Sequence, residues 1–404
     1  MNIIFLTMSD RVDVETSAIY SDLMRKFRNE GHNVYIVYPL ERRKGEKTQL
    51  RHADRVHYLG VRTLNLSGTN VIEKGIGQVF VEMLFKNAIK KHISGVKFDL
   101  ILYSTPPITF PKVIQYLKTI NPSAKTYLLL KDIFPQNAVD LGMMSKTGAK
   151  GILYRYFRGK EKKLYALSDH IGCMSPANVR YVIEHNPELD SNKVELAPNS
   201  YEFVEGDENL NEEEKRAVRE KYALPTDKPI FIYGGNLGKP QGIPFLIKCI
   251  DVNAQRNDCH FVVVGNGTEY GKLKSWYDTT KPKNVSVFQI IPKEDYDLLV
   301  KACDVGLIFL DYRFTIPNYP SRLLPYLMEK KPIVAATDLN CDTGSIAEEN
   351  GYGYWCPSND VSAFTQIVDK MLKADIAQMG DAGFKFFLKN YTVDNTYQAI
   401  IKHF

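Results

Sequence analysis

The chain has 404 residues, of which 44% are apolar, and 52 Lys and Arg against 47 Asp and Glu give a net charge of +5. This composition is too apolar for a disordered chain, and the length exceeds what one core comfortably holds, so we expect two domains of about 200 residues. No apolar run approaches the roughly 20 residues that cross a bilayer, and no signal pattern opens the chain. We therefore expect a cytoplasmic protein.

The charge is unevenly divided along the chain. Residues 1–200 contain 29 Lys and Arg against 19 Asp and Glu, a net +10, and residues 201–404 contain 23 against 28, a net −5. A basic half indicates an anionic partner, for which a membrane surface, a nucleic acid and a phosphorylated substrate all qualify. The six cysteines form no C-x-x-C pair, which favours buried thiols over zinc or disulfides.

The first half alternates strand and helix patterns. Apolar runs at 2–7 and 33–39 flank an amphipathic helix pattern at 18–32. Further elements follow: strands at 98–104, 125–130 and 171–175, and a helix at 154–168. This pattern predicts a mostly parallel sheet with helices on both faces.

An acidic connector at 201–229 ends in prolines, and the same rhythm then restarts. The predicted strands are 230–235, 260–267, 285–291 and 305–310, with helices at 243–256, 270–278 and 295–303. The fold class is therefore α/β, with two Rossmann-like doubly wound domains facing a central cleft. The predicted bounds are 1–200, 201–385, and a C-terminal helix, 386–404, that packs back toward the first domain.

A glycine-rich loop follows the first strand of the second half, in "FIYGGNLGKPQG". Gly234, Gly235, Gly238 and Gly242 lie between a strand and a helix, where bare amides and a helix N-terminus can meet a phosphate. Lys239 adds a positive charge. The alternative is a tight turn whose glycines only permit positive φ, and the loop alone leaves both interpretations open.

A second glycine pair, Gly265 and Gly267 in "VVVGNG", ends the next strand at the same sheet edge. This segment lacks the third glycine of a dinucleotide fingerprint, and no acidic residue follows at the expected spacing, which argues against NAD. Later in the chain, Pro320 and Ser321 of "NYPSRLLPYLMEKKPIVAA" can start a helix, with Ser321 as N-cap and Arg322 in the first turn. A fixed cation beside free amides favours a diphosphate.

The order of these motifs resembles that of a known family. "GGNLGKPQG", "VVVGNG", "CDVGLIFL" and "PSRLLPYLMEKKPIVAA" are similar to the carboxyl half of the family 4 retaining glycosyltransferases of GT-B fold, especially those of bacterial capsule and O-antigen synthesis. In the first half, "FDLILYSTPPITF", "LLLKDIFPQNAVDLG", "ALSDHIGCMSPANVRYVI" and "KVELAPNS" look like the landmarks of that subgroup. The resemblance covers nearly the whole chain.

The resemblance implies a role for particular residues. Lys239 and Arg322 would hold the donor diphosphate, and Asp132 would face the cleft from the acceptor side as a third catalytic residue. Asn199 would sit at the hinge. The expected donor-binding residues are Gly234, Gly235, Asn236, Gly238, Lys239, Gly265, Gly267, Ile290, Ile291, Asn318, Tyr319, Pro320, Ser321 and Arg322. The expected acceptor-side residues are Ser9, Asp10 and Asp132.

The implied activity is transfer of a sugar from a nucleotide diphosphate sugar to a lipid-linked or saccharide acceptor, with retention of configuration, in surface polysaccharide biosynthesis. We expect a UDP-linked donor, no cofactor, no metal and no nucleic acid partner. Asp295 and Asp297 imitate a D-x-D metal motif, but they stand at a predicted helix start, where acidic residues suit the helix dipole.

The chain departs from the family at several positions. Asn236 and Gln241 stand where the family has an arginine and a lysine, which leaves Lys239 as a displaced substitute, and the family's glycine-rich amino-terminal loop is missing near Ser9. Pro317 and Pro325 stand where the family has paired glutamates, the second of which usually holds the ribose. A non-catalytic nucleotide-sugar-binding homologue therefore stays an alternative, as does a GT-B-fold sugar nucleotide epimerase, which would use several carboxylates and histidines in the cleft.

Two segments of the basic half mix cations with apolar or aromatic residues, at 85–93 and 151–168. A solvated helix face explains such a pattern, but it also suits an anionic membrane surface. We expect peripheral contact with the inner face of the cell membrane.

Overall fold

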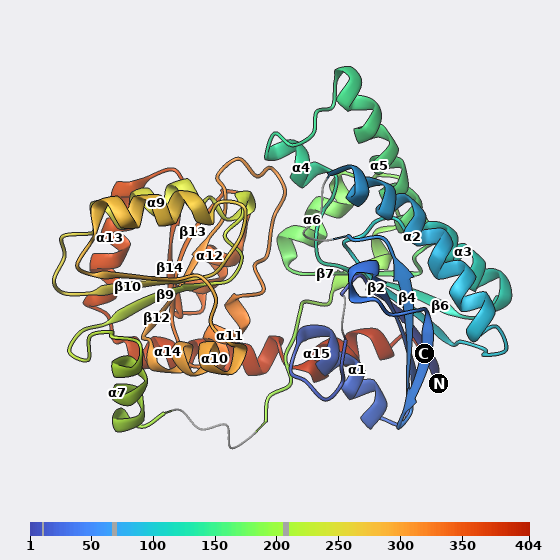
Figure 1. Cartoon of the computed structure of the whole chain (residues 1–404), viewed down its shortest axis with the longest axis horizontal. Helices are drawn as coiled ribbons and strands as arrows, with labels where there is room; N and C mark the ends of the chain where they lie inside the picture. Colours follow the sequence, from blue (N-terminus) through green and yellow to red (C-terminus); the bar gives the residue numbers. More distant parts are fainter. Residues whose placement is uncertain (10–11, 67–70, 205–209) are drawn as a thin grey trace. The chain divides into compact units, whose positions relative to one another are not determined.

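A computed structural model describes residues 1–9, 12–66, 71–204 and 210–404. The chain divides into two compact units, coloured along the sequence in Figure 1. Unit 1 comprises Met1–Glu202 together with Thr392–Phe404, and unit 2 comprises Phe203–Tyr391. The C-terminal segment therefore folds with the first half of the chain.

Within the described residues, unit 1 has one eight-stranded sheet in the order β3-β4-β2-β1-β5-β6-β7-β8. Its strands are β1 (Asn2–Leu6), β2 (Asn33–Glu41), β3 (Gln49–Ala53), β4 (Val56–Thr63), β5 (Leu100–Ser104), β6 (Lys125–Leu130), β7 (His170–Cys173) and β8 (Val194–Leu196). β3 pairs antiparallel with β4, and the other neighbouring strands pair in parallel. The sequence analysis did not predict the β3–β4 hairpin, because β3 is polar and largely exposed.

The helices of unit 1 are α1 (Ile19–Asn29), η1 (Arg42–Lys44), α2 (Val71–His92), α3 (Pro111–Ile120), α4 (Gln136–Asp140), α5 (Gly148–Leu167), α6 (Pro176–Glu184), η2 (Ser191–Lys193) and α15 (Val393–Ile401). α15 packs beside α1 (Figure 1). The rings of Phe27 and Tyr397 lie 5.1 Å apart, and Lys26 Nζ lies 2.6 Å from the Asp394 carboxylate. These contacts attach the end of the chain to the core of unit 1.

Unit 2 has a six-stranded sheet, counted within the described part of the chain, and its neighbouring strands are all parallel in the order β11-β10-β9-β12-β13-β14. The strands are β9 (Ile230–Gly234), β10 (His260–Val264), β11 (Val285–Phe288), β12 (Val305–Phe309), β13 (Ile333–Thr337) and β14 (Gly353–Pro357). All residues of β9, β10, β12 and β13 are buried, as expected for strands covered on both faces.

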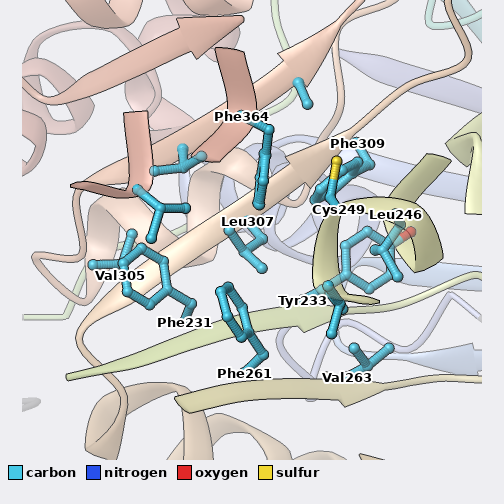
Figure 2. Packing of buried hydrophobic residues seen from close by; sticks show 14 of the residues in the cluster. Phe231, Tyr233, Leu246, Cys249, Phe261, Val263, Val305, Leu307, Phe309 and Phe364 are labelled. Atoms are coloured by element: carbon cyan, nitrogen blue, oxygen red, sulfur yellow. The ribbon is translucent and has the colours of Figure 1, made fainter. Parts of the chain in front are cut away.

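The helices of unit 2 are α7 (Glu212–Lys221), η3 (Lys239–Gln241), α8 (Ile243–Val252), α9 (Tyr270–Thr280), α10 (Lys293–Ala302), α11 (Leu323–Met328), α12 (Thr343–Glu349), α13 (Val361–Leu372) and α14 (Ile376–Asn390). Apolar residues of the sheet pack against Leu246 and Cys249 of α8 and Phe364 of α13 (Figure 2). This core fixes the strand ends from which the loops of the candidate site emerge.

Both units are doubly wound parallel structures, which confirms the predicted α/β class. The strand order reverses at β1 in unit 1, between β2 and β5, and at β9 in unit 2, between β10 and β12. Ligands of such sheets bind outside the carboxyl ends of the strands at this reversal. Among the described residues, no helix combines the length and apolarity needed to cross a bilayer.

Candidate functional site

The glycine-rich loop of unit 2 leaves the carboxyl end of β9, where the strand order reverses. Several of its amides are already engaged within the protein. Gly234 N donates to Tyr326 Oη at 3.2 Å, Gly235 N to Val264 O at 2.9 Å, and Leu237 N to Asn266 O at 2.9 Å. The sequence analysis expected bare amides here, and the structure differs because the loop after β10 and a tyrosine pack against them.

Close packing explains the glycines of the second loop. A Cβ atom on Gly265 would lie 1.9 Å from the carbonyl oxygen of Gly235, and one on Gly267 would lie 2.5 Å from that of Leu237. Real Cβ atoms do not come so close to backbone, so these two positions require glycine in order to hold the first loop in place. Gly235 itself has φ +121°, which favours glycine.

Arg322 is the most distinctive charged group of this sheet edge. Its guanidinium carbon lies 4.4 Å from the ring centroid of Tyr233, and its Nη1 is buried without a hydrogen-bond partner among the described residues. A Cβ on Gly235 would lie 3.6 Å from Arg322 Nη2, so the cation faces the glycine loop. A buried cationic nitrogen without a partner is costly, and an anion bound at the loop would satisfy it.

The start of α11 differs from the prediction. The helix begins at Leu323, with Arg322 in the N-cap position and no side-chain cap bond, instead of at Arg322 with Ser321 as N-cap. Pro320 and Ser321 are half-buried in the preceding turn. Arg322 therefore reaches the loop from the residue before the helix, where its side chain stacks on Tyr233.

Three tyrosines surround Arg322 without neutralising it. Burial raises the pKa of Tyr233 and of Tyr326, and raises that of Tyr296 to about 12, so these phenols stay uncharged near neutral pH. Tyr326 Oη donates to Ile232 O at 3.0 Å, and a Cβ on Gly234 would overlap Tyr296 Oη. The tyrosines position the guanidinium and leave its charge for a ligand.

Lys239 is exposed at the first position of η3, and no ion pair of its ammonium group is found among the described residues. The Gln241 side-chain oxygen accepts hydrogen bonds from Gly238 N and Asn236 Nδ2, both at 3.2 Å, which fixes the turn before Lys239. Asn236 is exposed at the tip of the loop. The two predicted cations thus differ, because Arg322 packs against Tyr233 and Lys239 is exposed.

The remaining predicted donor residues fall into two environments. Ile290 is 76% exposed after β11, and Ile291 is half-buried beside it. Asn318 Nδ2 is a buried donor without a partner in the described part of the chain, and Asn318 O accepts from Cys341 Sγ at 2.9 Å. The side chain of Tyr319, in contrast, is buried against Tyr391, with the two hydroxyls hydrogen-bonded.

The structure shows where the two prolines lie that stand in place of the family's paired glutamates. Pro317 is buried in the loop after β12, and Pro325 lies inside α11. The nearby carboxylate of Asp311 is paired with Arg313, at 2.7 Å from Nη2. Asp295 and Asp297 lie in α10 and pair with Lys221 at 2.8 Å and Lys293 at 2.6 Å, as expected of an exposed helix start.

In unit 1, Asp132 follows the carboxyl end of β6. Its amide donates to Thr105 Oγ1 at 3.4 Å, and Lys131 N donates to the same oxygen at 3.0 Å. Burial raises the pKa of Asp132 to about 6, and within the described residues its carboxylate has no ion pair or hydrogen bond. A carboxylate with this pKa at a strand end is suited to accept a proton.

Lys131, which the sequence analysis did not single out, extends from the same strand end in another direction. Its Nζ donates to Ala197 O at 2.9 Å, and burial lowers its pKa to about 7. It therefore does not pair with Asp132 but ties the end of β6 to the segment before Asn199, which is itself buried. The only sequence signal for Lys131 is its position directly after an apolar strand.

Ser9 follows β1, the strand next to β5, and its amide donates to Thr7 Oγ1 at 3.1 Å. It is half-buried and lines a cavity of about 430 Å³ at this sheet edge. Ser9, Thr105 and Asp132 thus follow three adjacent strands, β1, β5 and β6. Asp10, the other predicted acceptor-side residue, lies outside the described residues.

One cluster of possible metal ligands, His170, Glu195 and His403, was missed from the sequence because 233 positions separate the two histidines. Their rings stack with centroids 3.5 Å apart and planes 14° apart. Lone pairs in nearly parallel planes do not converge on one ion, and Glu195 already accepts from Lys402 at 2.6 Å and Tyr127 at 2.8 Å. The cluster serves to attach the C-terminal segment to unit 1.

Residues 214–384 match the family model described as Glycosyl transferases group 1. "Probable glycosyltransferase WbjE" of Pseudomonas aeruginosa is 22% identical over 393 residues, which cover 93% of this chain and 90% of that protein. "Putative colanic acid biosynthesis glycosyl transferase WcaI" of Escherichia coli (strain K12) is 22% identical over 252 residues, which cover 62% of this chain and 60% of that protein.

Solved structures resemble the whole chain. Sucrose-phosphate synthase from Thermosynechococcus elongatus has a TM-score of 0.73 at 14% identity, covering 100% of this chain and 98% of that one. HepE from Anabaena, solved in complex with UDP and glucose, has a TM-score of 0.69 at 13% identity, covering 100% and 99%. These likenesses show the predicted GT-B fold. The chain therefore has the GT-B fold, and within unit 2 residues 214–384 are similar to the group 1 glycosyl transferases.

Proposed function

We propose that this protein is a glycosyltransferase that moves a sugar from a nucleotide diphosphate sugar, UDP-linked, to a lipid-linked or saccharide acceptor in surface polysaccharide biosynthesis. The observation that carries the proposal is Arg322, whose buried Nη1 lacks a described partner and whose guanidinium faces Gly235 at the strand-order reversal of unit 2. The group 1 family match, the UDP complex of the HepE structure and the name of WcaI support the substrate class and the process.

The donor diphosphate would bind by charge. Arg322 would donate to its oxygens from a fixed position, and the exposed Lys239 would close over it, because charge-assisted bonds to phosphate are stronger than neutral ones. As the bond from the sugar to the diphosphate breaks, these cations would stabilise the negative charge that develops on the leaving group. This arrangement needs no metal ion, and we propose that turnover is metal-independent.

Asp132 would act on the acceptor. Its carboxylate would accept a hydrogen bond from the acceptor hydroxyl and take the proton as the new bond to the sugar forms, a role that suits a pKa of about 6. We propose that the acceptor attacks the face from which the diphosphate departs, so that configuration is retained. This last step rests on the resemblance to the retaining enzymes.

A donor screen tests the proposal. The protein is incubated with a panel of nucleotide sugars, with and without membrane lipid extract, and both released nucleoside diphosphate and sugar products are measured. Acceptor-dependent release of the diphosphate supports transfer. Interconversion of the nucleotide sugar without release would identify an epimerase instead, and binding without turnover would identify a non-catalytic homologue.

A further inference from the structure

Unit 1 contains an apolar cavity that the donor chemistry does not use. It has a volume of about 430 Å³ and lies at the carboxyl ends of β1 and β5. Its apolar walls include Met8, Leu66, Pro106, Ile108, Phe134 and Phe157. A cavity of this size and character falls in the range of small-molecule sites.

The wall also contains the buried carboxylate of Glu41, which pairs with Arg43 at 2.5 Å, and a hydroxyl that lacks a partner in the described part of the chain. Thr109 is 5% exposed and lines the cavity, and its Oγ1 has no hydrogen-bond partner among the described residues. A buried hydroxyl without a partner is unfavourable unless a ligand or water completes it. The cavity is therefore built for a mainly apolar ligand that carries a polar group.

Aromatic contacts continue from the cavity wall to the surface of α5, the long helix that follows α4 (Figure 1). The rings of Phe134 and Phe157 lie 5.1 Å apart, and those of Phe157 and Tyr156 lie 5.3 Å apart. One turn earlier on the helix, Ile152 is 65% exposed and Leu153 is 49% exposed. We call the apolar surface formed by these five residues the α5 track.

Cations border the α5 track. Arg155 is exposed between Leu153 and Tyr156 in the sequence, and Lys160 Nζ lies 5.9 Å from the ring centroid of Tyr156, although it also pairs with Glu82 at 3.2 Å. Exposed apolar side chains with Lys and Arg beside them are typical of helices that lie on anionic lipid. At the other end of the track, Phe134 is two residues from Asp132.

We propose that the cavity and the α5 track bind the apolar chain of a lipid-linked acceptor. The inference rests on the proposed function and narrows its acceptor class from lipid-linked or saccharide to lipid-linked. The chain runs from the bilayer along Ile152 and Leu153, past the aromatic rings and into the cavity. The polar end of the lipid then lies near Thr109, in the segment between β5 and α3, and near Asp132 at the end of β6.

Chain-length selectivity tests the proposal. The full protein is titrated by calorimetry with farnesyl phosphate, dodecyl phosphate and isopentenyl phosphate, which share a phosphate and differ in their chains. We expect a long chain to bind at least tenfold more tightly than isopentenyl phosphate. A preference between the two long chains identifies the chain type. Equal affinity for the long and short phosphates would overturn the inference, because only the headgroup would then be recognised.

Two kinds of variant locate the binding. Replacing both Ile152 and Leu153 by serine should reduce the selectivity for the long chain at least threefold, and Ser9→Trp, which fills the cavity, should abolish it. The matched control is Val252→Ser in unit 2, since Val252 is 63% exposed and lies on no such track. Unchanged selectivity in both kinds of variant would place the lipid elsewhere and overturn the inference.

Titration with UDP distinguishes a failure of the lipid inference from a failure of the proposed function. Each variant is also titrated with UDP, which should bind the variants and the wild type alike. A wild type that binds UDP without long-chain selectivity contradicts only the lipid inference. A wild type that shows long-chain selectivity but does not bind UDP contradicts the proposed function and leaves a lipid-binding protein.

Discussion

Asp132 affects both the proposed proton transfer and the stability of the fold, and a substitution can separate these two effects. Its pKa of about 6 lies above the ordinary value of 3.8 because burial disfavours the charged carboxylate. The folded protein therefore binds this proton more tightly than the unfolded chain. Above about pH 6 the ionised carboxylate lowers the free energy of unfolding, and this loss disappears as the pH falls below about 4.

We predict that Asp132→Asn reduces the transfer rate by roughly a hundredfold or more, the usual contribution of a proton acceptor. At pH 8 the same variant should melt at a higher temperature than the wild type, and the difference should shrink as the pH falls from 6 to 4. The wild-type rate should itself decline as the pH falls through about 6. A variant that keeps its rate but melts earlier at pH 8 would make Asp132 a structural residue.

The two candidate phosphate-binding cations could be predicted from the sequence, but the difference between their surroundings could not. Arg322 and Lys239 both stand near glycines, and the sequence marks both as phosphate ligands. Only the fold shows that Tyr233 stacks on the Arg322 guanidinium while Lys239 is exposed. The sequence also did not show that the Gly235 and Leu237 amides are hydrogen-bonded, because their acceptors lie at the end of β10 and in the loop after it.

The paired glycine loops of unit 2 form an element whose geometry depends on the absence of side chains. We predict that Gly265→Ala lowers the free energy of unfolding by about 1–3 kcal/mol, the range for an overpacked interior, because its Cβ would collide with Gly235 O. It should also weaken UDP binding, since the collision displaces the loop that faces Arg322. Urea unfolding and calorimetry measure the two effects.

The control for this loop variant is Gly271→Ala. Gly271 lies in α9, and a Cβ there would meet nothing within 4 Å. Alanine is the better helix former by about 0.5–1 kcal/mol, so this variant should be neutral or slightly more stable. If both variants behaved alike, the close approach of the two loops would not be what requires glycine at position 265.

Strands were easier to predict than helix starts. β9, β10 and β12 are continuous apolar runs, and burial on both faces needs such runs, so their positions follow from composition. The start of α11 lies one residue later than predicted, because Ser321 suits an N-cap but Arg322, which packs on Tyr233, takes that position. The β3–β4 hairpin lacked any apolar alternation to reveal β3.

At the scale of the whole molecule, the parallel α/β class could be predicted from the repeated pattern, whereas contacts between distant segments could not. His170 and His403 stack only because the C-terminal segment folds into unit 1. No local pattern in either segment indicates that the two histidines are neighbours. The same holds for the cavity beside Ser9, whose walls come from separate loops.

We also predict that the whole molecule attaches to anionic membranes. Three cations of α5 are paired within unit 1: Arg158 with Glu161, Lys160 with Glu82 and Lys162 with Glu188. Arg155 and Lys163 are exposed, with no ion pair in the described part of the chain. Each such cation near anionic lipid contributes on the order of 1 kcal/mol within a Debye length of about 8 Å.

We expect the protein to float with anionic vesicles at low salt and to be released at high salt. Reversing Arg155 and Lys163 to glutamate should weaken the binding at least tenfold. The control reverses Lys373 and Lys385, two exposed cations of the acidic half. Equal binding to neutral vesicles would indicate insertion of apolar residues, and equal losses in the two double variants would indicate that only net charge matters.

Calorimetric titration with UDP in the presence of EDTA tests the central claim most directly. We predict binding without added metal, weakened about ten- to a hundredfold by Arg322→Ala, because a hydrogen bond to a charged group contributes about 1.5–3 kcal/mol. Lys239→Ala should weaken it less, since exposed ion pairs contribute about 0.2–1 kcal/mol. Unchanged affinity in both variants, or binding that requires a divalent metal, would contradict a metal-independent diphosphate site at Arg322.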